Sequence, residues 1–345
     1  MTALPTVKDI AERAQVSIGT VDRVLHGRGR VAEETLVRVN NAVRELGYKP
    51  NMFARHLSLA RPRRFAVVMP RPGQDSGYWG LAVNGLRRAR QELSAFGAEV
   101  HRYHYDRTAA GSFERAISLA RTEGADAYLA ACVRPGEGGR VLRGLKQPYV
   151  LFDSELPGTK PLAYIGQDAY ASGRLAARLM QLIASGSPAA VIRTMSDDFH
   201  ISARVRGFSE YYASHGHSSR IRIFDIPADG DERSFGRICG EITAASPSFR
   251  AIFVSNAEAH RVVHYLRLKK RARCSVIGYD LIEANARCVS SGTVDFIIDQ
   301  RPDVQVYEGL MLLCRTTIRK EKLRRRRIIM PLDIITKENV QFHHS

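Results

Sequence analysis

The sequence has 345 residues, of which 44% are hydrophobic and 25% are charged, so it can bury a substantial core and we do not expect a disordered chain. Its first 15 residues contain Lys8, Asp9, Glu12 and Arg13 and no unbroken apolar run, which predicts neither a signal peptide nor a membrane span and favours a cytoplasmic protein. Five scattered cysteines without C-x-x-C spacing argue against a disulfide framework and against a cysteine zinc site.

The net charge is +17, from 52 Lys and Arg against 35 Asp and Glu. Residues 1–64 carry 12 basic and 6 acidic side chains and are the denser positive region. A positive field attracts polyanions and speeds association. We therefore expect nucleic acid as the leading partner and an anionic membrane as the second, with a solvated basic surface as the alternative.

Three short amphipathic helices are predicted within the first 50 residues. Thr6 opens a capping-box pattern for the first helix, and Ser17 is a suitable N-cap for the second. The third helix is expected to stop at Gly47. The apolar stripes of the three are Val7, Ile10, Ala11 and Ala14; Val21, Val24 and Leu25; and Leu36, Val39, Val43 and Leu46.

The tight turn between the first two helices leaves one face of the second free to enter a DNA major groove. On that face Arg23 can bind guanine through a bidentate fork, and Ile18 can pack on a thymine methyl group. The hydroxyl groups of Ser17, Thr20 and Thr35 suit phosphate contacts. The periodicity alone also fits a three-helix packing module that does not bind DNA.

The stretch TVKDIAERAQVSIGTVDRVL from Thr6, continued by VAEETLVRV from Val31 and ELGYKPN from Glu45, resembles the DNA-binding headpiece of the LacI family. The resemblance implies that Ile18, Gly19 and Arg23 contact bases. The DNA-binding residues that we predict are Thr6, Ser17, Ile18, Gly19, Thr20, Arg23, Arg30, Thr35, Asn51, Ala54 and Leu57.

Residues 51–64 lie where members of this family carry a hinge helix that orders on the operator. The resemblance implies that Leu57 is inserted into the minor groove, where an apolar wedge kinks the duplex. An ordinary linker helix is the alternative. Two positions depart from the family pattern, because Asp22 and Ala32 both stand where serine is usual. With Asp22 and Gly19 on the second helix, the operator sequence cannot be predicted from the resemblance.

From residue 65 onward, short apolar runs alternate with longer amphipathic segments, which predicts doubly wound α/β structure with ligand sites at the carboxyl ends of the strands. Helices are predicted around residues 79–86 and 175–182. The predicted buried strands are 65–69, 127–133, 149–152, 189–192, 251–254 and 275–277.

This region resembles bilobed, sugar-binding modules of the periplasmic-binding-protein type, on the stretches IGQDAYASGR from Ile165, SARVRGF from Ser202, VIGYD from Val276 and IMPLDI from Ile329. The resemblance implies two lobes that close around a sugar-sized ligand. We predict an all-α helix-turn-helix headpiece at 1–50, a hinge and linker at 51–64, and a bilobed effector-binding and dimerisation domain at 65–345. The expected N-lobe is about 65–163 and 295–325, and the expected C-lobe is about 164–294 and 326–345.

The resemblance implies that Arg204, three residues before the glycine of R-x-x-G-F, binds hydroxyl groups or a carboxylate of the ligand. Aromatic, amide and charged groups together suit a small polar ligand. The predicted ligand-binding residues are Tyr78, Trp79, Asp153, His200, Arg204, Asn256, Asp280 and Gln300, each with a structural role as its alternative. Ala257 replaces the carboxylate of the usual S-N-D pattern, which together with the positive charge suggests a sugar acid or sugar phosphate.

No G-x-G-x-x-G, P-loop, H-E-x-x-H or G-x-S-x-G pattern occurs, so we expect no enzyme, no catalytic or metal-binding residues and no cofactor. A transport binding protein is the stronger rival, but it would need an export signal in place of a DNA-binding motif. A regulator that has lost its response to a ligand is a further alternative. The arginine run 324–327 is interpreted as a solvated surface, with a second DNA or anion contact as the alternative.

These observations predict a repressor that binds palindromic operator DNA as a homodimer or tetramer. A small molecule, namely a sugar, sugar acid or sugar phosphate, would control its affinity for the operator.

Overall fold

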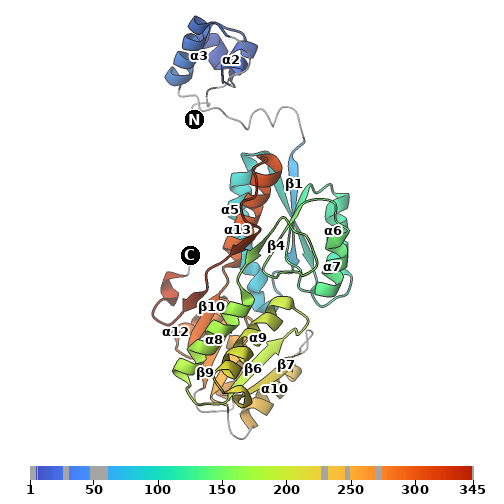
Figure 1. Ribbon diagram of the computed structural model, residues 1–345, viewed down its shortest axis with the longest axis vertical. Coiled ribbons are helices and arrows are strands. Elements are labelled where there is room, and N and C mark those ends of the chain that lie inside the picture. The colour runs from blue at the N-terminus through green and yellow to red at the C-terminus, as the bar shows by residue number, and fades with distance from the viewer. Residues whose placement is uncertain are drawn as a thin grey trace. The chain divides into compact units, whose positions relative to one another are not determined.

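The computed structural model describes residues 5, 7–25, 31–46, 61–226, 232–244, 249–268 and 274–343 (Figure 1). The chain divides into two compact units, Met1–Arg61 and Pro62–Ser345, which we describe separately. We call them the N-terminal unit and the bilobed unit.

The described part of the N-terminal unit contains three helices, α1 (Val7–Ala14), α2 (Ile18–Leu25) and α3 (Glu33–Glu45), which confirms the three predicted helices. Their shared core consists of Ile10, Ala11, Ala14, Val21, Val39 and Ala42. The expectation for Leu36 is wrong, because its side chain is 41% exposed and Ala42 packs in the core instead. Leu36 lies in the first turn of α3, and a 3.6-residue stripe does not show whether the neighbouring helices cover the end of a helix.

The described residues of the bilobed unit form two six-stranded sheets, which confirms the predicted α/β class (Figure 1). The first lobe is built on the order β11-β5-β4-β3-β1-β2, with every pair parallel. The second lobe is built on β12-β10-β9-β8-β6-β7, in which only β12 runs antiparallel. The first-lobe strands are β1 (Arg63–Pro70), β2 (Ala98–Tyr105), β3 (Ala127–Ala130), β4 (Tyr149–Phe152), β5 (Ala163–Gly166) and β11 (Arg327–Ile329). The second-lobe strands are β6 (Ala189–Thr194), β7 (Ile221–Ile226), β8 (Ala251–Val254), β9 (Ser275–Tyr279), β10 (Phe296–Asp299) and β12 (Asp333–Ile335).

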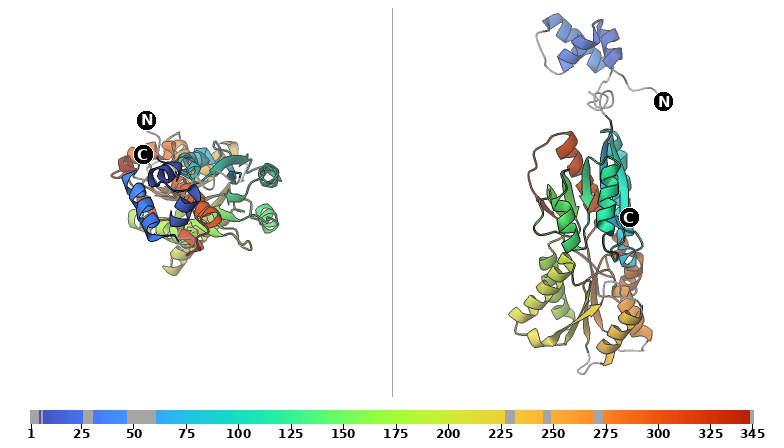
Figure 2. Two further views of the ribbon diagram at one scale, coloured as in Figure 1. Left: turned by 90° about the horizontal axis from the view of Figure 1, so that it is seen from above. Right: turned by 90° about the vertical axis from the view of Figure 1, so that its right-hand side faces the viewer.

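Helices cover both faces of each sheet (Figure 2). Those of the first lobe are α5 (Tyr78–Ser94), α6 (Ser112–Thr122), α7 (Pro135–Arg143) and α13 (Pro302–Leu313), with the short turns η1 (Asp75–Gly77) and η3 (Cys314–Ile318). Those of the second lobe are α8 (Ala169–Ile183), α9 (Phe199–Ser214), α10 (Glu232–Ala244), α11 (Ala259–Leu268) and α12 (Glu283–Ser290), with the short turns η2 (Ser218–Arg220) and η4 (Val340–Phe342).

The predicted strands all occur, but six more were missed: β2, β5, β7, β10, β11 and β12. In the edge strand β2, buried Val100 and Tyr105 alternate with polar residues, so no apolar run marks it. The edge strand β7 buries only Phe224 and Ile226. The other four strands have three or four residues each, which is too short for a periodic pattern.

The lobe boundaries need correction, because the chain crosses between lobes after the end of a strand. β5 and β11 belong to the first sheet and β10 to the second, so the boundaries expected at about 164, 295 and 326 each place a strand in the wrong lobe. Gln167 lies where these crossings meet. Its side-chain amide donates hydrogen bonds of 2.8 Å to the backbone oxygens of both Asp299 and Pro331, which ties the three crossing segments together.

Candidate functional site

The carboxyl ends of the strands carry residues in a costly backbone conformation. Asp153 follows β4, Met195 follows β6 and Asp280 follows β9, and their φ angles are 68°, 54° and 65°. Residues other than glycine rarely adopt positive φ, and such residues concentrate at functional sites. Asp153 and Asp280 are each the first residue after a strand, at the ends of the sheets where the two lobes meet.

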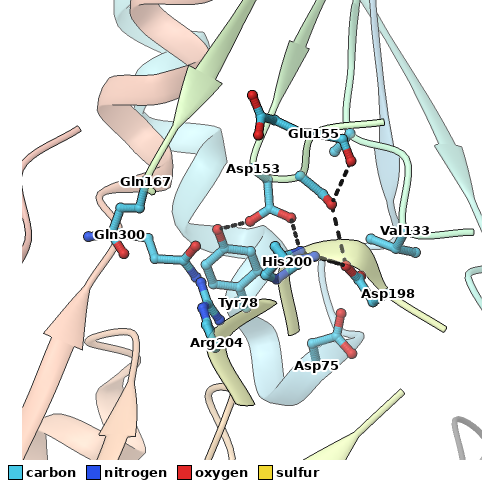
Figure 3. A network of polar contacts seen from close by, with 12 residues as sticks. Asp75, Tyr78, Val133, Asp153, Glu155, Gln167, Asp198, His200, Arg204 and Gln300 are labelled. Atoms are coloured by element: carbon cyan, nitrogen blue, oxygen red, sulfur yellow. Dashed lines mark hydrogen bonds and ion pairs between the residues drawn. The ribbon is translucent and has the colours of Figure 1, made fainter. Parts of the chain in front are cut away.

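Asp153 is the centre of a buried polar network formed by both lobes (Figure 3). The hydroxyl group of Tyr78, at the start of α5, donates a 2.5 Å hydrogen bond to Asp153 Oδ1. From the second lobe, His200 Nδ1 lies 3.9 Å from Asp153 Oδ2 and 2.7 Å from Asp198 Oδ1. Asp198 is also the N-cap of α9 and accepts the backbone N–H of His200. Helix capping therefore fixes the histidine at the lobe interface.

Asp280 anchors a second buried cluster. Gln300 Nε2 donates hydrogen bonds of 2.8 and 3.0 Å to the two carboxylate oxygens of Asp280. Arg204 donates from Nη1 to the backbone oxygen of Ser255 at 3.0 Å, and its guanidinium lies 3.8 Å from the ring centroid of Tyr279. The Arg204 side chain is almost wholly buried, so this cation–π contact acts without competing water.

Two glycines allow Arg204 to occupy this position. A Cβ at Gly173 of α8 would lie 2.0 Å from the backbone oxygen of Arg204, and one at Gly207 of α9 would lie 2.1 Å from that of Tyr170. The two helices therefore approach to backbone contact on both sides. These glycines occur in the stretches IGQDAYASGR and SARVRGF. The stretches that resemble a binding module therefore also allow the close helix packing that buries Arg204.

Burial dominates the electrostatics of this site. It raises the pKa of Asp280 well above its usual range, against the opposing effects of Arg204 and of the hydrogen bond from Gln300. Burial also raises the pKa of Asp153, although His200, Tyr78 and Arg204 oppose it. For Asp198 burial acts in the same direction but is outweighed by His200 and Arg107, so its pKa is lowered. The three carboxyl groups therefore differ in their readiness to ionise.

Several polar atoms at this place are buried without a hydrogen-bond partner. They are Asp153 Oδ2, Asp198 Oδ2, Arg204 Nε, Ser255 Oγ and Thr194 Oγ1. An unsatisfied buried polar group costs roughly 1–3 kcal/mol, so native proteins rarely gather several in one place. The first lobe thus supplies a free acceptor at Asp153, and the second lobe supplies an acceptor, a donor and two hydroxyl groups, which suits a hydroxyl-rich ligand.

A crevice of about 1060 Å³ lies next to this network. First-lobe residues between Arg107 and Arg140 line one side, and second-lobe residues 195–198, 225 and 226 line the other. Asp198 belongs to both the crevice and the buried network. Arg107 forms an ion pair with Asp75, whose other oxygen accepts a 2.6 Å hydrogen bond from Trp79 Nε1.

The eight residues predicted for the ligand do not all participate in the same way. Tyr78, Asp153, His200, Arg204, Asp280 and Gln300 form the two clusters described above. Trp79 packs edge-on against Tyr78 and Phe152 and reaches the network only through Asp75. Asn256 follows Ser255, accepts the backbone N–H of Glu258 with its side-chain oxygen, and is buried.

Sequence reasoning missed Asp75, Arg107, Asp198 and Ser255. Asp198 could have been found, because aspartate before a helical stretch is a typical N-cap. The other three depend on contacts between segments distant in sequence, which no local pattern reports.

In the N-terminal unit, α2 presents one face outward. Ser17 caps this helix: its hydroxyl oxygen accepts the N–H of Thr20 at 3.2 Å, as predicted. Val21 is fully buried on the inner side, while Ile18 is 50% exposed and Arg23 is exposed on the outer side. Among the described residues, Ile18 and Arg23 on this face of α2 are therefore accessible to solvent.

The structure describes only some of the other residues predicted to bind DNA. Gly19 is exposed and Thr20 half-buried on α2, and Thr35 lies near the start of α3, where its hydroxyl accepts a hydrogen bond from Arg38. Ala32 caps α3 without a side-chain hydrogen bond, as expected for alanine. Thr6, Arg30, Asn51, Ala54, Leu57 and most of the predicted hinge lie outside the described residues.

The fold and the site together define a bilobed binding domain in a chain that also carries a helix-turn-helix. Residues 65–321 match the periplasmic binding protein domain, and residues 6–51 match the bacterial regulatory proteins of the lacI family. The chain therefore belongs to the lacI family of regulators with an effector domain like the periplasmic binding proteins.

Relatives of known role agree with this assignment. Over 66 residues the chain is 46% identical to the HTH-type transcriptional regulator AscG of Escherichia coli. The matched stretch is 19% of this chain and 20% of AscG. Over 220 residues it is 23% identical to the sucrose operon repressor of Streptococcus mutans, which covers 59% of this chain and 61% of that protein. The chain spans about a fifth of the length of the first relatives it matches. These homologues are transcriptional regulators and not enzymes.

Solved structures extend the likeness over most of the chain. A crystal structure of a LacI-type regulator from Bacteroides fragilis has 28% identity and a TM-score of 0.76, over 82% of this chain and all of that one. GanP, a glucose-galactose binding protein from Geobacillus stearothermophilus, has 22% identity and a TM-score of 0.70, over 81% of this chain and 99% of that one, and shows the shared fold.

No helix in the described part of the chain is long and apolar enough to cross a membrane. Among the same residues, no group of three His, Cys, Asp or Glu side chains could hold a metal ion.

Proposed function

We propose that this chain is a cytoplasmic repressor. It binds a palindromic operator as a homodimer, and a sugar or sugar derivative between the two lobes sets its affinity for the operator. The observation that carries the proposal is the convergence of unpartnered buried polar atoms from both lobes, in a chain whose α2 exposes a capped, outward face. A homodimer is expected because two-fold symmetry of the protein matches a palindrome.

The chemistry of the site supports a polyhydroxylated ligand. Carboxyl, amide and guanidinium groups can each exchange hydrogen bonds with hydroxyl groups, and Tyr78 lies beside them. The carboxyl groups of Asp153, Asp198 and Asp280 outnumber the guanidinium of Arg204 in this network. A neutral sugar therefore suits it better than the sugar acid or sugar phosphate suggested by the net charge of the chain.

The composition of the site supports a coupling between ligand and DNA. Asp153 and Tyr78 come from the first lobe, and His200 and Arg204 come from the second, so one ligand that contacts both groups favours the closed arrangement of the lobes. A ligand changes operator affinity only by its difference in affinity for two conformations. Inducer and co-repressor are equally compatible with this scheme.

The test begins with selection of bound sequences from a random duplex library at near-physiological salt, because phosphate contacts make affinity depend on salt. We expect a palindrome with half-sites about one helical turn apart. Fluorescence anisotropy on that duplex with a panel of neutral sugars should then reveal one that shifts its affinity. A folded protein that enriches no sequence, with or without the sugar panel, would contradict the proposal.

A transport binding protein is the second candidate, because solved sugar-binding proteins share the fold of the bilobed unit. The same experiment separates the two. A transport protein binds sugar and enriches no DNA sequence, whereas the repressor does both.

A further inference from the structure

The most strongly charged segment of the bilobed unit lies outside the site described above. Residues 315–327, which we call the basic segment, contain eight Lys or Arg and one Glu, a net charge of +7 over 13 residues. The segment leads from the end of α13 to β11. It includes the arginine run 324–327.

The backbone of the basic segment is fixed to the first lobe. Leu323 packs against the hydrophobic core of that lobe. The backbone N–H of Glu321 bonds to the oxygen of Arg315 at 2.9 Å, and the backbone oxygen of Arg326 accepts the N–H of Tyr164 at 2.8 Å. Leu323 and the hydrogen bond from Tyr164 thus hold the segment against the first lobe, while the Glu321–Arg315 hydrogen bond closes a turn within it. Its basic side chains extend outward.

Most of these cations have no counter-charge. Arg315, Arg319 and Arg327 pair with Glu308, Glu321 and Glu155. Among the described residues, five further side chains are exposed and have no hydrogen-bonded or ionic partner: Lys320, Lys322, Arg324, Arg325 and Arg326. A fixed row of five uncompensated cations is costly by self-repulsion, and a polyanion relieves it.

The position of the segment indicates which polyanion. β11 runs parallel to β5, and every pair in the first sheet is parallel, so the basic segment lies at the amino edge of that sheet. β1 begins at the same edge, at Arg63, so the chain enters the bilobed unit from the N-terminal unit at this edge. Lys146 and Lys160, just before β4 and β5, add exposed cations at this edge. The polar network described above lies at the opposite, carboxyl edge.

We propose that the basic segment is a second DNA-binding surface, which holds the phosphate backbone of the same duplex that α2 binds. This inference rests on the proposed function as an operator-binding protein. Contacts with phosphate carry no sequence information, so the segment would strengthen binding to every duplex equally. Base contacts by Arg23 would supply the selectivity.

The test compares two triple variants of the full chain that each remove three positive charges. In the first, Lys322→Gln, Arg324→Gln and Arg325→Gln neutralise the basic segment. In the control, Arg178→Gln, Arg220→Gln and Arg250→Gln neutralise three exposed arginines of the second lobe, which likewise have no ion pair among the described residues. The affinity of each for the selected operator with long flanks, and for a random duplex of equal length, is measured against salt concentration.

Each lost phosphate contact should reduce the slope of log K against log salt by about 0.9, so the basic-segment variant should lose up to about 2.7. It should weaken operator and random duplex by the same factor, while the control keeps the slope of the unmodified protein. Equal slopes for all three proteins would overturn the inference, as would equal losses in both variants.

Three further outcomes are distinct. If the basic-segment variant keeps its DNA slope but loses binding to vesicles of anionic lipid, the partner is a membrane surface and the DNA assignment is wrong. If the unmodified chain enriches no operator at all, the proposed function fails and this inference fails with it. If operator binding depends on Arg23 but the slope does not depend on the segment, only this inference fails.

Discussion

The two binding regions of this chain expose their functional groups in opposite ways. Ile18 and Arg23 point outward from α2. This helix is held in place by the Ser17 cap and by the buried side chain of Val21. The lobe interface instead buries Asp153, Arg204 and Asp280 and keeps several of their atoms without partners. A substitution in the exposed region should therefore reduce function and leave the stability of the fold unchanged. In the buried region, stability and function should change together.

The largest effect is expected for Arg204→Ala. It removes a buried guanidinium beside raised-pKa carboxyl groups, so we expect a loss of roughly 3–5 kcal/mol in the free energy of unfolding and no remaining response to sugar. Urea unfolding and sugar titration measure the two. Arg206→Ala is the matched control, because Arg206 lies two residues further along α9 and is exposed. Similar losses for both variants would show that burial of Arg204 is not the cause.

Arg23→Ala should act on DNA alone. We expect specific operator affinity to fall by about 1–3 kcal/mol, with sugar binding and unfolding unchanged, because Arg23 is exposed and would contact a base. Binding is measured on the selected operator and on random DNA. An equal loss on both duplexes would contradict base contact by this residue.

Ser17→Ala tests whether the cap positions α2. Loss of the hydrogen bond to the Thr20 N–H should destabilise the N-terminal unit by about 1 kcal/mol, whereas Ser17→Gly should cost only a few tenths. Thermal unfolding followed by circular dichroism measures the difference. Equal melting temperatures for the alanine variant and the unmodified protein would show that the cap contributes nothing.

A change in stability of the opposite sign is expected for Asp280→Asn at high pH. Because the folded-state pKa of Asp280 is raised, the folded protein holds this proton more tightly than the unfolded chain, so the aspartate destabilises the fold at pH values above its folded pKa. The asparagine variant should be the more stable protein at high pH. Its advantage should shrink as pH falls through the raised pKa towards the unfolded value near 4. A constant difference across pH would contradict this.

The sequence predicted the N-terminal unit better than the lobe interface, for a physical reason. Helix caps and 3.6-residue stripes are local, so Ser17, Val21 and α1–α3 could be placed from the sequence alone. Leu36 was misplaced because the periodic stripe of α3 does not show which of its members the other helices cover.

In the bilobed unit, buried apolar runs marked the central strands. The edge strands and the very short strands lacked such runs. The approach of His200 to Asp153, and the pairing of Asp75 with Arg107, depend on segments brought together by folding. Family resemblance supplied Arg204, and the glycines at 173 and 207 explain why it fits.

The central claim is that one ligand couples the buried site to DNA. The most direct measurement is the operator affinity of the full chain with and without a neutral sugar whose binding depends on Arg204. We predict a change of about 5- to 150-fold in operator affinity, matched by an equal change in sugar affinity when operator is present. A sugar that binds through Arg204 and leaves operator affinity unchanged would contradict the account.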